Sequence, residues 1–352
     1  MKYTRNKTRK VNVGKVTIGG ADNIIVQSMT NTNTADVSAT VKQIHVLEKA
    51  GCEIVRVSVP DETSAAALSK IKKKINIPLV ADIHFDYKLA LLAIANGADK
   101  VRINPGNMRK DKLKDILNMA KDRNTAIRIG VNSGSLKKLH GSSIKLSSEK
   151  RAGILVDAVS EYLNTFERES FYNTVVALKA SDVGTTIKAC EIFSNNFKYP
   201  AHIGITESGS LFQGSIKSTA GLAQIISGGL GDTMRISLSA DPVWEVRAAY
   251  ILLQSLGIRQ KMPNIISCPT CARTTVDVIK LVAEIEKVLY SFDWSGDRAC
   301  LKTIAVMGCV VNGPGEAKEA DLGITGAGNK ICLFKKGRII ATLKKEQFRS
   351  VF

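Results

Sequence analysis

The 352-residue sequence is poor in aromatic side chains and has no long apolar runs. Phe, Trp and Tyr together make up 5% of the residues, which argues against a surface that stacks nucleic-acid bases, since stacking needs exposed rings. No apolar run approaches the ~20 residues that a membrane-spanning helix needs. The first residues are polar and do not resemble a signal-peptide core. We therefore expect a cytoplasmic protein that does not enter a membrane.

Acidic residues are also scarce relative to basic ones. The chain has 50 Lys and Arg residues against 32 Asp and Glu residues, which gives a formal net charge of +18. A basic surface favours anionic partners, and these include phosphorylated metabolites, acidic proteins and nucleic acid. The net charge alone does not choose among the three.

Short β-branched runs, by contrast, are plentiful, and they alternate with stretches of helical periodicity. Eight such strand–helix units predict an α/β protein built on a (β/α)8 TIM barrel. An open doubly wound sheet is the alternative, but its first strand should lead into a glycine-rich phosphate loop, and Gln27-Ser28-Met29-Thr30-Asn31 stands there instead. A short hairpin is expected over residues 11–20. The eight predicted strands cover residues 24–30, 53–59, 79–84, 100–106, 126–132, 174–180, 201–207 and 232–238.

The alternation stops near residue 257, where a second pattern begins. A helical stretch from about Thr274 to Leu289 precedes an apolar strand from Thr303 to Met307 and a hairpin from Lys330 to Leu343. These elements predict a small α+β domain. We therefore divide the chain into a barrel domain at residues 1–257 and a second domain at residues 258–352.

Polar residues stand late in nearly every predicted barrel strand, where the active sites of TIM barrels lie. Five cations and few acids would converge on one opening. Because buried unpaired charge is costly, such a cluster indicates an anionic substrate, of which a diphosphate is the simplest. Glu207 could contact a substrate hydroxyl, take part in proton transfer or only balance charge. The candidate residues are Arg56, Asp82, His84, Arg102, Arg128, Asn132, Lys179, Glu207, Arg235 and Ser237.

The seven cysteines are an odd number and thinly spread, so a disulfide framework is not expected. Cys268-Pro269-Thr270-Cys271 could bind zinc, bind an iron–sulfur cluster or act as a redox dithiol. Zinc modules usually show a second tight pair, whereas a distant cysteine such as Cys309 can complete an iron–sulfur site. Glu316 is either a fourth ligand or a surface acid. The remaining thiols, which we interpret as structural, are Cys52, Cys190, Cys300 and Cys332.

Taken together, several motifs resemble the family of 4-hydroxy-3-methylbut-2-en-1-yl diphosphate synthases. The likeness extends from about residue 5 to residue 345, and the last motif is the most specific. The motifs are Met29-Thr30-Asn31-Thr32, Val80-Ala81-Asp82-Ile83-His84-Phe85-Asp86, Arg102-Ile103-Asn104-Pro105-Gly106-Asn107, Arg128-Ile129-Gly130-Val131-Asn132, Gly204-Ile205-Thr206-Glu207, Cys268-Pro269-Thr270-Cys271 and Cys309-Val310-Val311-Asn312-Gly313-Pro314-Gly315-Glu316.

The resemblance implies reductive ring opening and dehydroxylation of 2-C-methyl-D-erythritol 2,4-cyclodiphosphate in the non-mevalonate isoprenoid pathway. It implies a [4Fe–4S] cluster held by Cys268, Cys271, Cys309 and Glu316. It places the diphosphate at Arg56, Arg102, Arg128 and Lys179, with Asn132, Arg235 and Ser237 also at the substrate and Glu207 facing the reacting carbons. It further implies an acidic electron donor, flavodoxin or ferredoxin, and a homodimer in which the cluster domain of one subunit caps the barrel of its partner.

Two other functions remain as alternatives. Radical-SAM enzymes also combine a barrel with a cluster, but they normally keep three cysteines in one C-x-x-x-C-x-x-C loop, which is absent here. A basic zinc module that contacts nucleic acid would be colourless and would contain about one zinc ion per chain. Iron and sulfide content therefore separates that class from the enzyme.

Overall fold

The computed structural model describes residues 4–21, 23–84, 86–104, 110–132, 146–292, 301–311 and 317–344. The chain divides into two compact units, Met1–Leu256 and Gly257–Phe352. Within the described part of the chain, none of the helices has both the length and the apolar character needed to span a bilayer.

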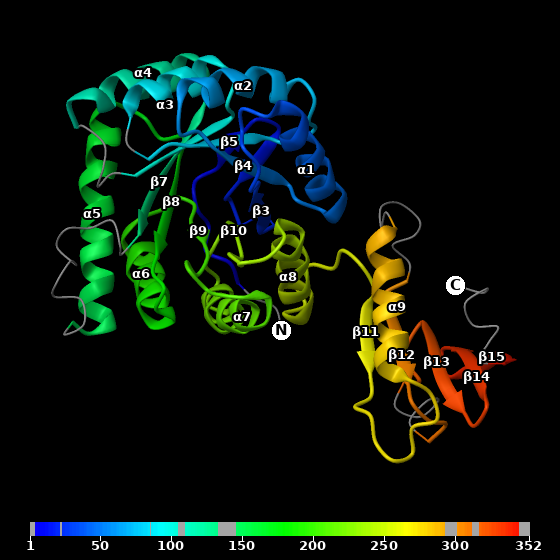
Figure 1. Ribbon diagram of the computed structural model, residues 1–352. Helices are drawn as coiled ribbons and strands as arrows, with labels where there is room; N and C mark the ends of the chain where they lie inside the picture. Colours follow the sequence, from blue (N-terminus) through cyan, green and yellow to red (C-terminus); the bar gives the residue numbers. More distant parts are fainter. Residues whose placement is uncertain are drawn as a thin grey trace. The chain divides into compact units, whose positions relative to one another are not determined.

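The first unit is a parallel barrel of eight strands in the order β8-β7-β6-β5-β4-β3-β10-β9 (Figure 1). A single parallel bridge between Val176 and Ala201 links the two ends of this order. The predicted TIM barrel is therefore confirmed. The strands are β3 (Ile25–Met29), β4 (Ile54–Ser58), β5 (Leu79–Asp82), β6 (Lys100–Ile103), β7 (Ala126–Asn132), β8 (Thr174–Lys179), β9 (His202–Ile203) and β10 (Thr233–Met234).

Each predicted barrel strand contains one observed strand, but β9 and β10 are much shorter than the predicted runs 201–207 and 232–238. Pairing between β9 and β10 covers only two residues on each strand. Beyond it, Arg235 N still donates to Ile203 O at 3.0 Å, while the chain turns away at Glu207, whose φ is +53°. Glu207 and Ser237 therefore lie in loops after the strands.

The barrel helices begin at the carboxyl ends of the strands, and aspartates cap most of them. The side chains of Asp36, Asp61, Asp86, Asp182 and Asp241 each accept a hydrogen bond from a backbone N–H of the first turn. Many acids near this end are thus used as helix caps. The helices are α1 (Val37–Ala50), α2 (Glu62–Lys72), α3 (Tyr87–Ala95), α4 (Leu113–Asp122), α5 (Ser148–Arg168), α6 (Val183–Asn196), α7 (Leu211–Ser227) and α8 (Pro242–Ser255), with a 3-10 turn, η2, at Lys110–Lys112.

The predicted hairpin, β1 (Val11–Val13) and β2 (Val16–Ile18), is confirmed. Its buried residues Val11, Val13 and Ile18 pack against the first inward side chains of the barrel strands. This hydrophobic contact covers the amino-terminal end of the barrel and is called the floor below. The barrel residues in it are Ile25, Ile54, Val80, Ala126 and Val175.

The second unit is a five-stranded mixed sheet with one described helix. The strand order is β11-β12-β13-β14-β15. Strands β11, β12 and β13 pair in parallel, whereas β14 pairs antiparallel with both β13 and β15. Helix α9 buries Leu281, Ile285 and Leu289 in the apolar core beside the sheet. The elements are β11 (Asn264–Ser267), α9 (Val278–Ser291), β12 (Thr303–Met307), β13 (Leu322–Ala327), β14 (Lys330–Lys335) and β15 (Arg338–Lys344).

The predicted strand 303–307 and the predicted hairpin are confirmed, whereas β11 and β13 were not predicted. β13 lacks an alternating apolar pattern because Gly323 and Gly326 interrupt it. The ring of Phe334 lies over Gly323, where an added Cβ would come within 2.0 Å of it. The helix begins four residues later than expected, at Val278, because Asp277 caps it by accepting from Lys280 N at 3.0 Å.

Candidate functional site

Strand register places the candidate cations on one face of the barrel sheet. Directly paired residues lie on the same face, and the pairs include Met29 with Arg56, Asp82 with Arg102 and Arg102 with Arg128. The same register puts Lys179 opposite Asn132 at the end of β7 and β8. Since Ile25, Ile54 and Val80 of this face form the floor, the face is the barrel interior.

Asp82 is the central acid of this interior. Its carboxylate lies 3.3 Å from Arg102 Nη1 and 3.9 Å from Arg56 Nε, and its side chain is almost fully buried. Burial alone would raise the pKa of Asp82, but Arg56, the hydrogen bond to His84 and Arg102 together hold it well below its usual range. Asp82 is therefore ionised and orients two of the arginines.

His84 joins the same group from just beyond β5. Its Nε2 atom lies 3.3 Å from Asp82 Oδ2 and 2.9 Å from Arg102 Nη1, while almost half of the side chain is exposed. Asp82 and His84, both candidate residues of the sequence, are therefore neighbours in the structure. The exposed part of the ring leaves His84 accessible from the opening of the barrel.

Arg235 has an acidic partner that the sequence analysis missed. Arg235 Nε and Nη2 donate to the two carboxylate oxygens of Glu245 at 2.9 and 2.8 Å. Glu245 is buried on α8 and also accepts from Ser28 Oγ at 2.8 Å. Glu245 lies on the helix that follows the strand and not within a strand run, so no motif spacing in the sequence points to it. The five candidate cations are thus less uniform than their sequence positions suggest, and Arg235 is a fixed, paired arginine.

Arg128 and Lys179, by contrast, have no carboxylate partner among the described residues. Arg128 Nε and Nη1 are buried without any hydrogen-bond partner there. Burial first, then Arg56 and Arg102, lower the pKa of Arg128. Burial first, then Arg128 and Arg56, likewise lower the pKa of Lys179. Such unpaired, mutually repelling cations are stabilised when an anion binds between them.

The other candidates of the barrel lie around the same opening. Glu207 is exposed in the loop after β9, and its left-handed backbone is unusual for a residue with a side chain. Ser237 is half-buried in the loop after β10. The backbone of Asn132 ends β7, and its side chain lies outside the described residues.

In the second unit, Cys268 and Cys309 follow neighbouring parallel strands, β11 and β12. The Gly308 N–H donates to Cys268 Sγ at 3.1 Å, immediately before Cys309 in the chain. Cys271 is exposed, and the backbone N–H of Arg273 lowers the pKa of its thiol. An N–H donor to sulfur and an acidified thiol are typical surroundings of cysteines that bind iron–sulfur clusters.

The candidate metal ligands do not form a complete site in the described part of the second unit. There, no three His, Cys, Asp or Glu side chains are grouped closely enough to hold a metal ion. Glu316 and Cys300 lie outside the described residues. Cys52, Cys190 and Cys332 are buried, and burial raises the pKa of both Cys52 and Cys190 to about 12, as expected for structural thiols.

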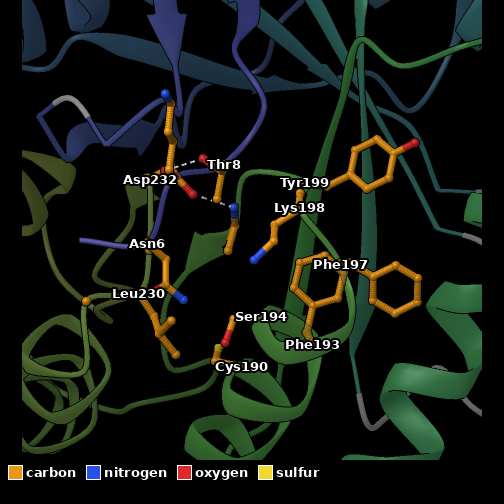
Figure 2. A pocket seen from close by; sticks show the side chains of 14 residues that line it. Asn6, Thr8, Cys190, Phe193, Ser194, Phe197, Lys198, Tyr199, Leu230 and Asp232 are labelled. Atoms are coloured by element: carbon orange, nitrogen blue, oxygen red, sulfur yellow. Dashed lines mark hydrogen bonds between the residues drawn. The ribbon is translucent and has the colours of Figure 1, made fainter. Parts of the chain in front are cut away.

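One pocket of the first unit lies near the amino-terminal ends of β9 and β10 (Figure 2). Asn6, Thr8 and Leu230 line it, and Thr8 Oγ1 donates to Asp232 at 2.9 Å. Its cavity of about 20 Å³ has room for roughly one water molecule. This pocket is therefore not a substrate site, and the candidate site remains the carboxyl end of the strands.

The fold and this site define an enzyme of the TIM-barrel class, with buried basic side chains that have no carboxylate partner among the described residues of its opening. Residues 8–250 match the family model of the GcpE TIM-barrel domain, and residues 264–352 match that of the GcpE protein C-terminal domain. The chain belongs to the GcpE family.

Curated relatives agree with this assignment over nearly the whole chain. The chain is 51% identical over 344 residues to a protein of Geobacillus thermodenitrificans, covering 97% of this chain and 90% of the relative. It is 50% identical over 343 residues to a protein of Bacillus subtilis, covering 97% and 89%. Both relatives are named 4-hydroxy-3-methylbut-2-en-1-yl diphosphate synthase (flavodoxin).

Solved structures of much lower sequence identity share the barrel. A dihydropteroate synthase from Stenotrophomonas maltophilia, 14% identical, aligns with a TM-score of 0.51 over 71% of this chain and 99% of that one. A dihydropteroate synthase from Yersinia pestis, 9% identical, aligns with a TM-score of 0.51 over 71% and 100%. At these identities the similarity shows the TIM-barrel fold alone.

Proposed function

We propose that this chain converts 2-C-methyl-D-erythritol 2,4-cyclodiphosphate to 4-hydroxy-3-methylbut-2-en-1-yl diphosphate. Two carbon–oxygen bonds of the substrate break, one to a phosphate oxygen and one to a hydroxyl. A carbon–carbon double bond forms, two electrons are consumed, and the hydroxyl leaves as water after protonation. The names of the relatives at 50–51% identity give this product and flavodoxin, an electron carrier, and so support the reaction.

The barrel residues hold the diphosphate in this proposal. Arg128 and Lys179 are buried basic residues without a carboxylate partner among the described residues, while Asp82 orients Arg56 and Arg102 toward the same space. Arg235, fixed by Glu245, and Ser237, Asn132 and His84 complete the polar surroundings of the substrate. This cationic pocket stabilises the phosphate that is released when the ring opens.

Glu207 faces the reacting carbons in this proposal. Its position in a strained turn after β9 supports a role at the site, because strained backbone persists where surrounding structure enforces it. Glu207 either positions a substrate hydroxyl or donates the proton with which that hydroxyl leaves.

The second unit, residues 258–352, is the cluster domain in this proposal, and residues 1–257 are the substrate domain. Cys268, Cys271, Cys309 and Glu316 would hold a [4Fe–4S] cluster, which when bound supplies single electrons to the substrate. A carboxylate ligand such as Glu316 is displaced more easily than a thiolate. The Gly308 N–H would stabilise the negative charge on the Cys268 sulfur.

Flavodoxin is the proposed electron donor, as the relatives' names indicate for those proteins. Flavodoxins are acidic, and the net charge of +18 favours docking of such a carrier. We further propose a homodimer in which the cluster domain covers the barrel of the partner. The exposed apolar side chains of Val310 and Val311, next to Cys309, support a surface that becomes covered.

The observation that carries the proposal is the pair of buried basic residues Arg128 and Lys179, which have no carboxylate partner among the described residues of a GcpE-family barrel. The test measures turnover of the cyclic diphosphate without oxygen, with dithionite and a mediator as reductant. The purified protein should be brown, contain iron and sulfide, and form the open-chain diphosphate. Near-wild-type turnover by Cys309→Ala would refute the proposed role of the cysteines.

The dimer has a separate test. Cys309→Ala and Arg128→Met are each expected to be inactive, but a mixture that exchanges subunits should regain up to about a quarter of wild-type activity if each site uses two chains. Mixing two batches of Cys309→Ala alone is the control. Activity that stays at the level of this control would exclude a shared site.

A further inference from the structure

Lys100 is a fully buried cation that the proposed mechanism does not use. It is the first residue of β6, and its side chain is 0% exposed. It lies on the same inward face as Arg102, two positions further along the strand. Its Nζ atom donates to Gln27 Oε1 at 3.3 Å, the one hydrogen bond of this nitrogen among the described residues.

The groups around Lys100 are mostly cationic or neutral. Arg56 on β4, Arg128 on β7 and His202 on β9 face it from the other strands. Among the described residues, the acid that acts on Lys100 is Asp99, just before β6, and its carboxylate is already bound to Lys72 and to Leu79 N. No carboxylate forms an ion pair with Lys100 in the described part of the chain.

Several buried nitrogens around Lys100 also lack hydrogen-bond partners in the part of the chain that the structure describes. Gln27 Nε2 and Arg128 Nε are donors, whereas His202 Nε2 donates in one tautomer of the neutral ring and accepts in the other. His202 Nδ1, in contrast, pairs with Thr233 Oγ1 at 2.5 Å. The layer therefore has more hydrogen-bond donors than acceptors, and a negative charge above it would relieve the imbalance.

An ammonium group in this position is unfavourable in the substrate-free barrel. It has three N–H donors and one acceptor, no counter-ion and two arginines nearby. Burial first, then Arg128 and Arg56, lower the pKa of Lys100 well below its usual value. A phosphate bound at Arg128 would cancel that repulsion and favour the charged form.

We propose that Lys100 is a reserve cation, neutral in the substrate-free barrel and protonated when the phosphates of the substrate bind above it. This inference rests on the proposed function. Lys100 acts as a positioning residue: its charge, delivered beneath Arg128, holds the phosphates without touching them. The proton comes from the buffer, because each phosphorus of the cyclic diphosphate carries a single strongly acidic hydroxyl that is already ionised at neutral pH.

The experiment measures proton uptake on binding by isothermal titration calorimetry in buffers of different ionisation enthalpy. The holoenzyme is titrated with the cyclic diphosphate without oxygen or reductant, so that no turnover occurs. The wild-type protein should take up about one proton more per site than Lys100→Met near pH 8. As pH rises, the Kd of the wild-type protein should therefore increase by up to about tenfold more per pH unit than the Kd of Lys100→Met.

The matched control is Lys188→Met, which removes an exposed lysine of α6 and should keep the wild-type uptake. Lys179 can also take up a proton, and the difference between wild type and Lys100→Met isolates Lys100 from it. If Lys100→Met does not fold by circular dichroism, Lys100→Gln, which can still donate to Gln27, replaces it.

The outcomes separate the two proposals. Equal uptake in wild type and the Lys100 variant overturns the reserve cation while leaving the proposed function intact. Zero uptake by wild type between about pH 7 and 9 overturns it without reference to any variant. Failure of wild type to bind the cyclic diphosphate overturns the proposed function and the inference with it.

Discussion

The barrel opening and the thiol-bearing edge of the second unit hold their functional side chains in different ways. In the barrel, strand register brings Asp82, Arg102 and Arg128 onto neighbouring inward positions. In the second unit, Cys268 and Cys309 follow neighbouring strands, but Cys271 is exposed and the described donors do not close around a metal. The barrel holds its charges in place by strand register, whereas the described thiols alone do not form a metal site.

The largest expected effect comes from removing a thiol of the second unit. Cys268→Ala should lower both bound iron and turnover by at least about 10²-fold, since losing a ligand costs more than losing its supporting contacts. Iron and sulfide analysis with an anaerobic activity assay measures both. The control is Cys332→Ala, which removes a buried thiol of the same unit and should keep its iron. Equal iron loss in the two variants would contradict the ligand assignment.

Two arginine variants compare a buried cation that lacks a carboxylate partner among the described residues with one that has such a partner. Arg128→Met should lower kcat/KM by roughly 10²–10³-fold, because a cation at the phosphates is lost. It should also raise the free energy of unfolding by roughly 1–3 kcal/mol, because an unpaired buried charge is removed. Denaturant unfolding of the substrate-free protein measures this second change.

Arg235→Met is the matched partner of that experiment. It leaves the buried carboxylate of Glu245 without its arginine, so the free energy of unfolding should fall by roughly 3–5 kcal/mol. Opposite signs for Arg128→Met and Arg235→Met are the expected result. Destabilisation by both variants would show that Arg128 has a counter-ion in the folded protein.

The loss of stability at acidic pH should depend in part on the buried histidine of the barrel, His202. Burial first, then Lys179 and Arg128, lower the pKa of His202 well below its usual value, so the folded state keeps it neutral. The unfolded chain takes up this proton as pH falls below about 6.5, so stability falls with falling pH by up to about 1.4 kcal/mol per unit. Urea unfolding between about pH 5 and 7 should show a shallower slope for His202→Gln than for wild type. Identical slopes would mean that His202 titrates normally.

The smallest effect concerns the reactivity of the thiols once the metal has been removed. Cys271 is exposed with a lowered pKa, whereas Cys52 and Cys190 are buried and have raised pKa values. Iodoacetamide should therefore alkylate Cys271 first in the apoprotein, as peptide mass spectrometry would detect. Early alkylation of Cys52 or Cys190 would indicate that the barrel opens locally.

The sequence predicted the barrel well because its pattern is local. Each strand is a β-branched run, and the polar residue near its end identifies the opening, as at Asp82 and Lys179. Glu245 escaped prediction because it reaches Arg235 from a helix, a contact that depends on tertiary packing. Lys100 was not predicted as an interior charge because it begins its strand, although its spacing from Arg102 places both residues on one face. Strands β11 and β13 were not predicted because β11 is mostly exposed and β13 contains glycines.

The floor made by β1 and β2 has a kinetic consequence. Val11, Val13 and Ile18 cover the amino-terminal end of the strands, so the opening is the route by which solvent reaches the layer of Lys100 and Gln27. In the complex proposed above, a substrate at Arg128 would occupy that route. If Lys100 is the proposed reserve cation, its proton would have to reach the interior before the phosphates bind or together with them, and it would return to solvent only after the product departs. Entry and exit through one opening therefore impose an order on binding, charge uptake and release.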